Sequence, residues 1–227
     1  LSKVPRVNLL FYLISSLKNK HNMKILHVLD HYKPHFSGYV FRTNYILKYQ
    51  RELGLEPIVV TSPKQGFEEI KYQELDGVRI YNTPQNNFGS TPFVKEVRLM
   101  NALQKKIEEV IKIESPDIIH AHSPCLNGTP ALRVGRKNGI PIVYEVRAFW
   151  EDAAVDHGTF TESSGKYKIS RFIETRLLKK MDALFTICEG LKKEIVARGI
   201  HSEKVTIIPN CVDTGFFSTC EYDEEIA

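Results

Sequence analysis

The sequence of 227 residues lacks several features that would define its class at once. Its four cysteines form no C-x-x-C pair, which argues against a zinc site or a disulfide framework and favours free thiols in a cytosolic protein. No apolar run reaches the ~20 residues that a membrane-spanning helix requires. The G-x-G-x-x-G fingerprint is absent, which argues against binding of a nicotinamide dinucleotide. Internal repeats and low-complexity segments are absent as well.

The sequence also lacks a strong excess of either charge. It has 31 lysines and arginines against 27 aspartates and glutamates, a net charge of +4. This mild balance is compatible with weak attraction to anionic ligands or membrane surfaces, and it argues against a dedicated nucleic-acid binder. The hydrophobic content of 42% is ordinary for a soluble globular protein. We therefore expect one large or two small domains with a full core.

The two ends of the chain differ from its middle. Because the first residue is Leu1, we expect a fragment or a processed product; Met23 looks like a natural start, which makes residues 1–22 an N-terminal extension. Their most apolar stretch is flanked by basic residues and has no small-residue cleavage site, so an interfacial helix or a loosely packed extension is expected rather than a signal peptide. We expect the main domain over residues 23–217, and an acidic tail or the start of a linker over residues 218–227.

Five apolar runs each end in residues suited to binding or chemistry. Helical patterns separate most of these runs, which is typical of a parallel sheet with helices on its faces. Ligands of such sheets bind beyond the carboxyl ends of the strands, so we expect the terminal residues to share one rim. They are Ser37-Gly38, His120 with His122, Glu145 with Arg147, Cys188-Glu189, and Asn210 with Asp213.

The same patterns predict individual elements. Strands are expected at residues 24–30, 57–61, 117–119, 141–145, 183–187 and 204–208, and helices at residues 39–53, 93–114, 128–138, 166–181 and 189–198. Residues 78–81 alternate like a half-exposed edge strand. Residues 147–165 form a long predicted loop, and a loop of this length in a compact domain is more often functional than accidental.

Ser37-Gly38 lies between the first strand and its helix. A glycine lets the backbone approach a ligand closely, and the N-terminus of a helix offers free N–H groups to an anion such as a diphosphate. A tight turn between strand and helix explains the same residues equally well.

His120 and His122 lie two residues apart and therefore on the same face of a strand. Of the two, one is expected to be buried under a covering helix and the other to reach the rim. A histidine in a strand is usually a hydrogen-bonded core residue, but two at a strand end favour a functional role. Nothing nearby in the sequence completes a metal geometry, so hydrogen bonding to a substrate or to a leaving phosphate is the preferred role.

Glu145 and Arg147 also lie two residues apart. Arginine at a rim favours bidentate contact with phosphate or carboxylate, and the alternative is an internal ion pair between the two residues. Trp150, the only tryptophan, either stacks on a sugar or closes the core. The acidic residues that follow it, Glu151, Asp152 and Asp156, offer either a general base or a solvated loop.

The predicted helix at residues 166–181 has two possible roles. Its apolar residues share one face, and lysines and arginines occupy the rest of the helix. A solvated surface helix explains this pattern, and docking on anionic lipid explains it as well. The apolar residues are Ile169, Phe172, Ile173, Leu177 and Met181.

Several strings resemble a known family. They are Ile-Ile-His-Ala-His at 118–122, Ile-Cys-Glu-Gly-Leu at 187–191, Ile-Pro-Asn-Cys-Val-Asp at 208–213, the opening from Met23 to His31, and Ser-Gly-Tyr at 37–39. Over residues 23 to about 217 the chain resembles the amino-terminal domain of GT-B glycosyltransferases of family 4. Three further strings, at 41–43, 61–65 and 144–152, look like the subgroup associated with exosortase and exopolysaccharide gene clusters.

The resemblance implies a retaining transferase that moves a sugar from a nucleotide-sugar to a glycan or a lipid-linked acceptor. It implies no cofactor and no required metal, and no nucleic-acid partner is expected. By the same resemblance Ser37-Gly38 lies near the donor phosphates and His122 is the catalytic residue beside the reacting sugar. Glu145 and Arg147, with Trp150, are expected on the acceptor side. The implied location is the cytoplasm, with peripheral contact at the inner membrane face as an option.

The sequence departs from the family pattern at two positions. The first loop has one glycine where two are common, and Cys211 replaces a glycine of the usual Pro-Asn-Gly. The carboxy-terminal domain, which in the family binds the nucleotide and carries two glutamates, is missing, so we expect this chain alone to be inactive. A non-catalytic Rossmann-like module that binds a glycan or a partner is the alternative. A sugar-nucleotide epimerase would require acid and base carboxylates that the sequence does not identify.

Overall fold

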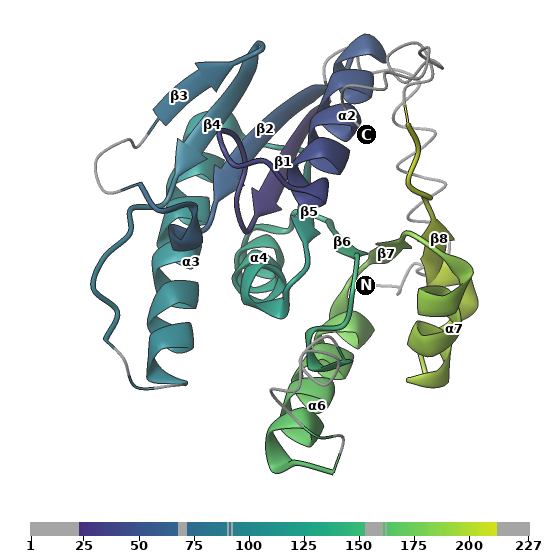
Figure 1. The fold of residues 1–227 in the computed structure, drawn as a ribbon. Coiled ribbons are helices and arrows are strands. Elements are labelled where there is room, and N and C mark those ends of the chain that lie inside the picture. Colours follow the sequence, from purple (N-terminus) through teal and green to yellow (C-terminus); the bar gives the residue numbers. More distant parts are fainter. Residues whose placement is uncertain are drawn as a thin grey trace, which may run out of the picture.

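The computed structural model describes residues 23–67, 72–89, 91, 93–152, 161 and 163–212, which form one sheet with helices on both faces (Figure 1). The strands lie in the order β3-β4-β2-β1-β5-β6-β7-β8, and only the β3–β4 pair is antiparallel. Their bounds are β1 (Lys24–Leu29), β2 (Glu56–Thr61), β3 (Tyr72–Leu75), β4 (Val78–Asn82), β5 (Ile118–His122), β6 (Ile142–Val146), β7 (Ala183–Thr186) and β8 (Val205–Ile207). The predicted Rossmann-like sheet is confirmed.

The helices lie unequally on the two faces. They are α2 (Gly38–Glu52), α3 (Val94–Glu114), α4 (Cys125–Asn138), α6 (Gly165–Lys180) and α7 (Glu189–Ala197), with short 3-10 turns η1 (Pro63–Gln65) and η2 (Ser202–Lys204). The crossover through α2 runs along the sheet in the direction opposite to the later ones, so right-handed crossovers place α2 on one face and the other helices on the opposite face. Among the described helices, α2 is therefore alone on its face.

The core follows this division. Val40 and Leu47 of α2 pack with Leu29 and Val59 in a small apolar cluster. The opposite face carries a larger cluster, to which β1, β5 and β6 contribute alternate residues and to which α3, α4, α6 and α7 also contribute. None of the described helices combines the length and the apolar character that crossing a bilayer requires.

The helix ends follow local chemistry. The Ser37 hydroxyl accepts a hydrogen bond from the Val40 N–H and caps α2. Gly139 ends α4 in the left-handed conformation, with φ of 68°, which glycine adopts without strain. Pro116 follows the end of α3, as the restriction that proline places on its preceding residue predicts.

Two expectations from the sequence are wrong. Residues 78–81 belong to β4, which lies inside the sheet between β2 and β3, and β3 is the edge strand. β3 was missed because which strand lies at the edge depends on long-range pairing, and its four residues lack an apolar run. Helix α4 begins at Cys125, before the predicted start at residue 128. The thiols of Cys125, Cys188 and Cys211 are free, as predicted, and Cys220 lies outside the described residues.

The predicted apolar stripe of α6 is buried only in its second half. Leu177 and Met181 are 4% and 1% exposed, as expected for core residues. Ile169, Phe172 and Ile173 are 61%, 59% and 41% exposed. The helix itself was predicted correctly, but its first apolar residues face solvent and do not pack on the core.

Candidate functional site

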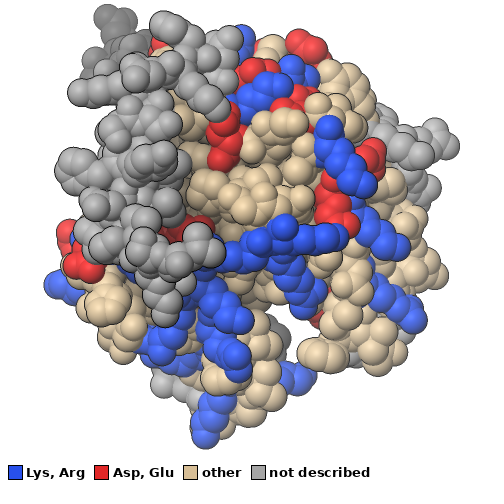
Figure 2. Space-filling view, turned by 180° about the vertical axis from the view of Figure 1, so that it is seen from behind, with Lys and Arg blue, Asp and Glu red and all other residues tan. Residues whose placement is uncertain are grey.

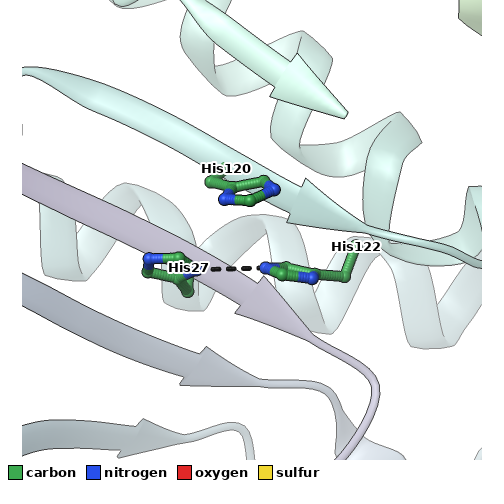
Figure 3. A group of neighbouring side chains, drawn as sticks. All are labelled: His27, His120 and His122. Carbon is green, nitrogen blue, oxygen red and sulfur yellow. Dashed lines mark hydrogen bonds between the residues drawn. The ribbon is translucent and has the colours of Figure 1, made fainter. Parts of the chain in front are cut away.

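The sheet reverses its direction of growth between β1 and β5. The chain moves from β1 to β2 on one side and later adds β5 on the other side. Parallel sheets bind ligands beyond the carboxyl ends of their strands at such a point. The register pairs His27 with His120 and His122 with Glu145, so these four side chains share the face that α2 covers. Figure 3 shows the three imidazoles together on that face.

A directional chain of hydrogen bonds runs through two of the histidines. Arg147 Nη2 lies 2.8 Å from His122 Nδ1, and a guanidinium only donates, so this nitrogen accepts. The proton of a neutral His122 is therefore on Nε2, which lies 3.0 Å from His27 Nδ1. His27 must in turn carry its proton on Nε2, which lies 2.8 Å from Gln50 Oε1. Arg147 and Gln50 thus fix the tautomers of both imidazoles.

The surroundings keep both imidazoles neutral. Burial, with the nearby His120 adding to its effect, lowers the pKa of His27 from 6.5 to about 3. Burial also lowers the pKa of His122 well below its ordinary value, with His120 and Arg147 adding to the effect. The side chains of His27 and His122 are 0% exposed, and that of His120 is 4% exposed. Both histidines of β5 are therefore buried. The expectation that one of them reaches the rim is wrong, because α2 and Arg147 cover the end of β5.

Glu145 is the fixed negative charge beneath this chain. Its side chain is completely buried, and Oε1 accepts hydrogen bonds from Arg147 Nε at 2.7 Å and Arg42 Nε at 2.8 Å. Oε2 lies 3.4 Å from His120 Nε2. Burial alone would raise the pKa of Glu145, but the nearby His120 and the charge of Arg147 outweigh it and hold the pKa far below its ordinary range. Glu145 is therefore a carboxylate that two arginines share.

The guanidinium of Arg147 forms several further contacts. Besides Glu145 and His122, it donates to the Tyr39 carbonyl at 2.8 Å and to Thr43 Oγ1 at 3.0 Å. It also lies 4.2 Å above the centre of the Tyr39 ring. The internal Glu145–Arg147 ion pair that the sequence offered as an alternative is present. Arg147 is thus a rigid, pre-oriented cation at the carboxyl end of β6.

Several residues of this network were not predicted as site residues: His27, Tyr39, Arg42, Thr43 and Gln50. Four of them come from α2, whose contact with β5 and β6 no local pattern reveals. His27 offered a signal, because it is the one ionisable residue inside an otherwise apolar buried strand. Its pairing with His120 appears only in the register of β1 with β5.

The three buried histidines also raise the question of a metal. Their potential ligand nitrogens lie within 4.8 Å of one another. The rings of His120 and His122, however, are stacked with centroids 4.2 Å apart and an angle of 24° between their planes. Stacked rings cannot direct in-plane lone pairs at one ion, and His27 Nδ1 already accepts from His122. The geometry fits a hydrogen-bonded stack, and the absence of a required metal stays a prediction.

The predicted donor-phosphate loop lies at the N-terminus of α2. The Ser37 hydroxyl caps the helix and lies 3.1 Å from His31 Nε2. A Cβ placed on Gly38 would meet nothing within 4 Å, so the packing of the chain itself does not require glycine there. The backbone at Gly38 borders open space, as a ligand approaching the helix N-terminus needs.

Trp150 is 54% exposed and therefore does not close the core. Lys64 Nζ lies 5.2 Å from the centre of its ring and 3.1 Å from Asp30 Oδ1. Asp30 follows β1, Lys64 follows β2 and Trp150 follows β6. Because β1 and β5 lie between β2 and β6, this contact crosses the strand ends at the reversal point.

The acidic residues after Trp150 have structural partners. Glu151 is 2% exposed and forms an ion pair of 2.7 Å with Arg198, so it does not belong to a solvated loop. Asp152 Oδ1 accepts a hydrogen bond from the Tyr167 hydroxyl at 2.9 Å. Asp156 and Asp213 lie outside the described residues. Of the other predicted rim residues, Glu189 is exposed, and Asn210 accepts from Arg42.

A groove of about 820 Å³ runs along α2 beside residues 208–212. Tyr45 and Tyr49 form part of its wall, and its lining is largely apolar. Gln50 and Arg147, the two ends of the hydrogen-bond chain, both line it. The buried network therefore meets open space at both of its ends.

The fold and the site define the class of the protein as a Rossmann-like α/β domain with polar residues gathered at the reversal point of its sheet, where such domains bind ligands. The Glycosyltransferase Family 4 model matches residues 36–216, and the chain belongs to this family. The transferase family assignment agrees with the resemblance found in the sequence.

The individual proteins that the chain resembles share only part of its length or little of its sequence. The chain is 35% identical over 107 residues to the sulfoquinovosyl transferase SQD2 of Arabidopsis thaliana. The aligned stretch covers 47% of this chain and 19% of that protein. Its fold is similar to the sucrose-phosphate synthase of Thermosynechococcus elongatus, with a TM-score of 0.63, 11% identity, and coverage of 85% of this chain and 49% of that chain. It is also similar to HepE of Anabaena, solved in complex with UDP, with a TM-score of 0.56, 15% identity, and coverage of 88% and 47%. The chain spans about half the length of these solved structures.

Proposed function

We propose that this chain is the acceptor-binding half of a retaining glycosyltransferase that moves a sugar from a nucleotide-sugar to a glycan or a lipid-linked acceptor. The observation that carries the proposal is the pre-oriented Arg147 at the reversal point of the sheet, in a chain that belongs to a transferase family. A fixed cation at this place suits a reaction in which positioning and charge stabilisation supply most of the rate.

The N-terminus of α2 is the proposed neighbour of the donor diphosphate. Gly38 borders open space in the first turn of the helix, and the N-terminus of a helix attracts anions. The complex of HepE with UDP, a protein of the same fold, supports a nucleotide-sugar as the donor. Like the family, the chain is proposed to use no cofactor and no metal.

Arg147, Glu145 and Trp150 form the proposed acceptor side. Arg147 lines the groove and Trp150 offers an exposed ring, so these two can contact a ligand. Glu145 is completely buried, and its role is to hold Arg147. The resemblance implied that His122 lies beside the reacting sugar. Because His122 is also buried, we propose that it acts through the Arg147 guanidinium, from which it accepts a hydrogen bond.

The biological setting is part of the proposal. The resemblance to the exopolysaccharide subgroup favours the assembly of a surface polysaccharide or glycolipid in the cytoplasm, with contact at the inner membrane face and without a nucleic-acid partner. A second domain is proposed to supply the nucleotide site, since the chain spans about half the length of the solved structures of this fold.

The test compares this chain with the longest product of its gene. Both proteins are incubated with radiolabelled nucleotide-sugars and a total lipid and glycan extract, and label in the product is counted. We expect transfer by a two-domain product and none by the 227-residue chain. Transfer by the chain alone would contradict the division of labour. A gene that ends at this chain, with glycan binding and no transfer, would instead support the binding module.

A further inference from the structure

Helix α6 carries an apolar surface that no other element of the described residues packs against. Ile169, Phe172 and Ile173 lie three and four residues apart, so they form one stripe, and each is at least 41% exposed. The buried side of the same helix contains Glu174 and Leu178, which are 4% and 0% exposed. The exposed stripe is therefore additional to the face that anchors the helix to the core.

Positive charge surrounds this stripe. The basic residues of α6 are Lys166, Lys168, Arg171, Arg176, Lys179 and Lys180. Of these, Arg171 forms an ion pair of 2.7 Å with Glu194 of α7. The only acidic residue of the helix, Glu174, is buried and accepts a hydrogen bond from the Tyr144 hydroxyl. Arg176 lies 5.5 Å from the centre of the Phe172 ring, so it joins the apolar and the cationic parts. The lower part of Figure 2 shows lysines and arginines gathered over this region.

The position of α6 relates the surface to the candidate site. The helix follows β6 and precedes β7, so it begins near the carboxyl ends of the strands and runs back along the sheet. In Figure 1 the first turns of α6 extend beyond the end of the sheet. The exposed stripe belongs to these first turns and therefore lies on the same side of the molecule as the strand ends.

We propose that the exposed face of α6 docks on an anionic lipid surface. Apolar side chains enter the boundary between head groups and acyl chains, and flanking lysines and arginines bind anionic head groups. A second copy of the chain fits this surface less well, because a two-fold contact would bring two clusters of like charge together. The further consequence, that docking brings the strand ends to a lipid-linked acceptor, rests on the proposed function; docking itself does not.

The test measures sedimentation of the 227-residue chain with vesicles. Vesicles of phosphatidylcholine alone are compared with vesicles that contain about one third phosphatidylglycerol, at low and at physiological salt. We expect binding to the anionic vesicles, weakened by salt. The double variant Phe172→Ser with Ile173→Ser should partition at least about tenfold more weakly. Lys168→Gln and Lys179→Gln should each weaken partitioning about fivefold.

Matched variants on another helix serve as controls. Ile113 of α3 is 59% exposed, the same fraction as Phe172. Ile113→Ser therefore removes a comparably exposed apolar side chain from a different helix. Lys105→Gln removes one exposed charge from α3. Residues 1–22 stay unchanged in every variant, so a difference between variants reports on α6. Circular dichroism confirms that each variant is folded.

Three outcomes would overturn the proposal. The first is equal binding by the α6 variants and the α3 controls, and the second is no preference for anionic vesicles. The third is a dimer in light scattering that Phe172→Ser with Ile173→Ser dissociates, which would assign the surface to a second copy. Vesicle binding together with transfer only to soluble glycans would keep the docking surface and reject the lipid-linked acceptor.

Discussion

The central strands β1, β5 and β6 have two faces that are equally buried and chemically opposite. On the face of α3, α4 and α6, alternate residues are apolar: Leu26, Val28, Ile119, Ala121, Tyr144 and Val146. On the face of α2, the residues between them are His27, His120, His122 and Glu145. The first face gains stability from burial of apolar surface. The second depends on hydrogen bonds and ion pairs among its buried polar groups, an arrangement that adds little net stability but holds Arg147 in one orientation.

The largest expected effect comes from removing the buried charge. Glu145→Gln leaves Arg42 and Arg147 without their shared carboxylate and should lower the free energy of unfolding by about 3–5 kcal/mol. On the other face, Leu26→Ala leaves a cavity at a 0% exposed position and should cost about 2–5 kcal/mol. Urea unfolding measures both. Of the two variants, only Glu145→Gln should also reduce transfer per folded molecule of the proposed two-domain enzyme; equal losses of transfer would remove the distinction between the faces.

The apolar face should make stability fall as pH rises. Burial raises the pKa of Glu174 from 4.5 to about 7, and the nearby Glu151 adds to the rise. The folded state therefore holds this proton more tightly than the unfolded state. The stability that the Glu174 proton contributes is fully present below pH 4.5. It is lost as the pH rises through 7, and the loss is on the order of 3 kcal/mol. Glu174→Gln should remove this decrease; parallel pH profiles for both proteins would contradict the assignment.

The polar face should show the opposite dependence. Its lowered pKa keeps His27 neutral in the folded state, so the stability that this contributes is present above pH 6.5 and is lost as pH falls toward 3. Nitrogen-15 NMR at pH 5 should show His27 and His122 neutral, with the proton on Nε2. A charged imidazole at that pH, or a proton on Nδ1 of either ring, would break the hydrogen-bond chain as described.

The smallest effect is expected at the end of that chain. Gln50→Leu leaves the His27 Nε2–H without its acceptor and should cost about 1–2 kcal/mol. Gln50→Glu keeps an acceptor at the same place and should restore most of the loss. The two variants are compared by thermal unfolding, and equal destabilisation would show that the hydrogen bond to His27 is unimportant.

The sequence predicts one of these faces better than the other. The apolar alternation of the strands and the order of strand and helix are local patterns, so the parallel sheet was predicted correctly. Ser37-Gly38, His122, Glu145 and Arg147 were also selected locally, because each follows an apolar run, and their roles in a site stay predictions.

The partners of these residues could not be predicted in the same way. Arg42 and Glu145 are 103 residues apart, and only the packing of α2 over β6 brings them together. For the same reason the sequence left open whether Arg147 pairs internally or contacts a ligand. Which of the α6 residues face solvent likewise depends on the rotation of the helix against α4, which its own periodicity does not determine.

We propose that the polar face holds Arg147 for sugar transfer. The most direct test is the transfer rate of the proposed two-domain enzyme carrying Arg147→Gln. The control is Arg136→Gln, which changes an exposed arginine paired with Asp182 far from the carboxyl ends of the strands. Steady-state kinetics on protein verified as folded should show kcat reduced at least about 100-fold by Arg147→Gln and unchanged by Arg136→Gln. A rate for Arg147→Gln within about twofold of the unmodified enzyme would contradict the account.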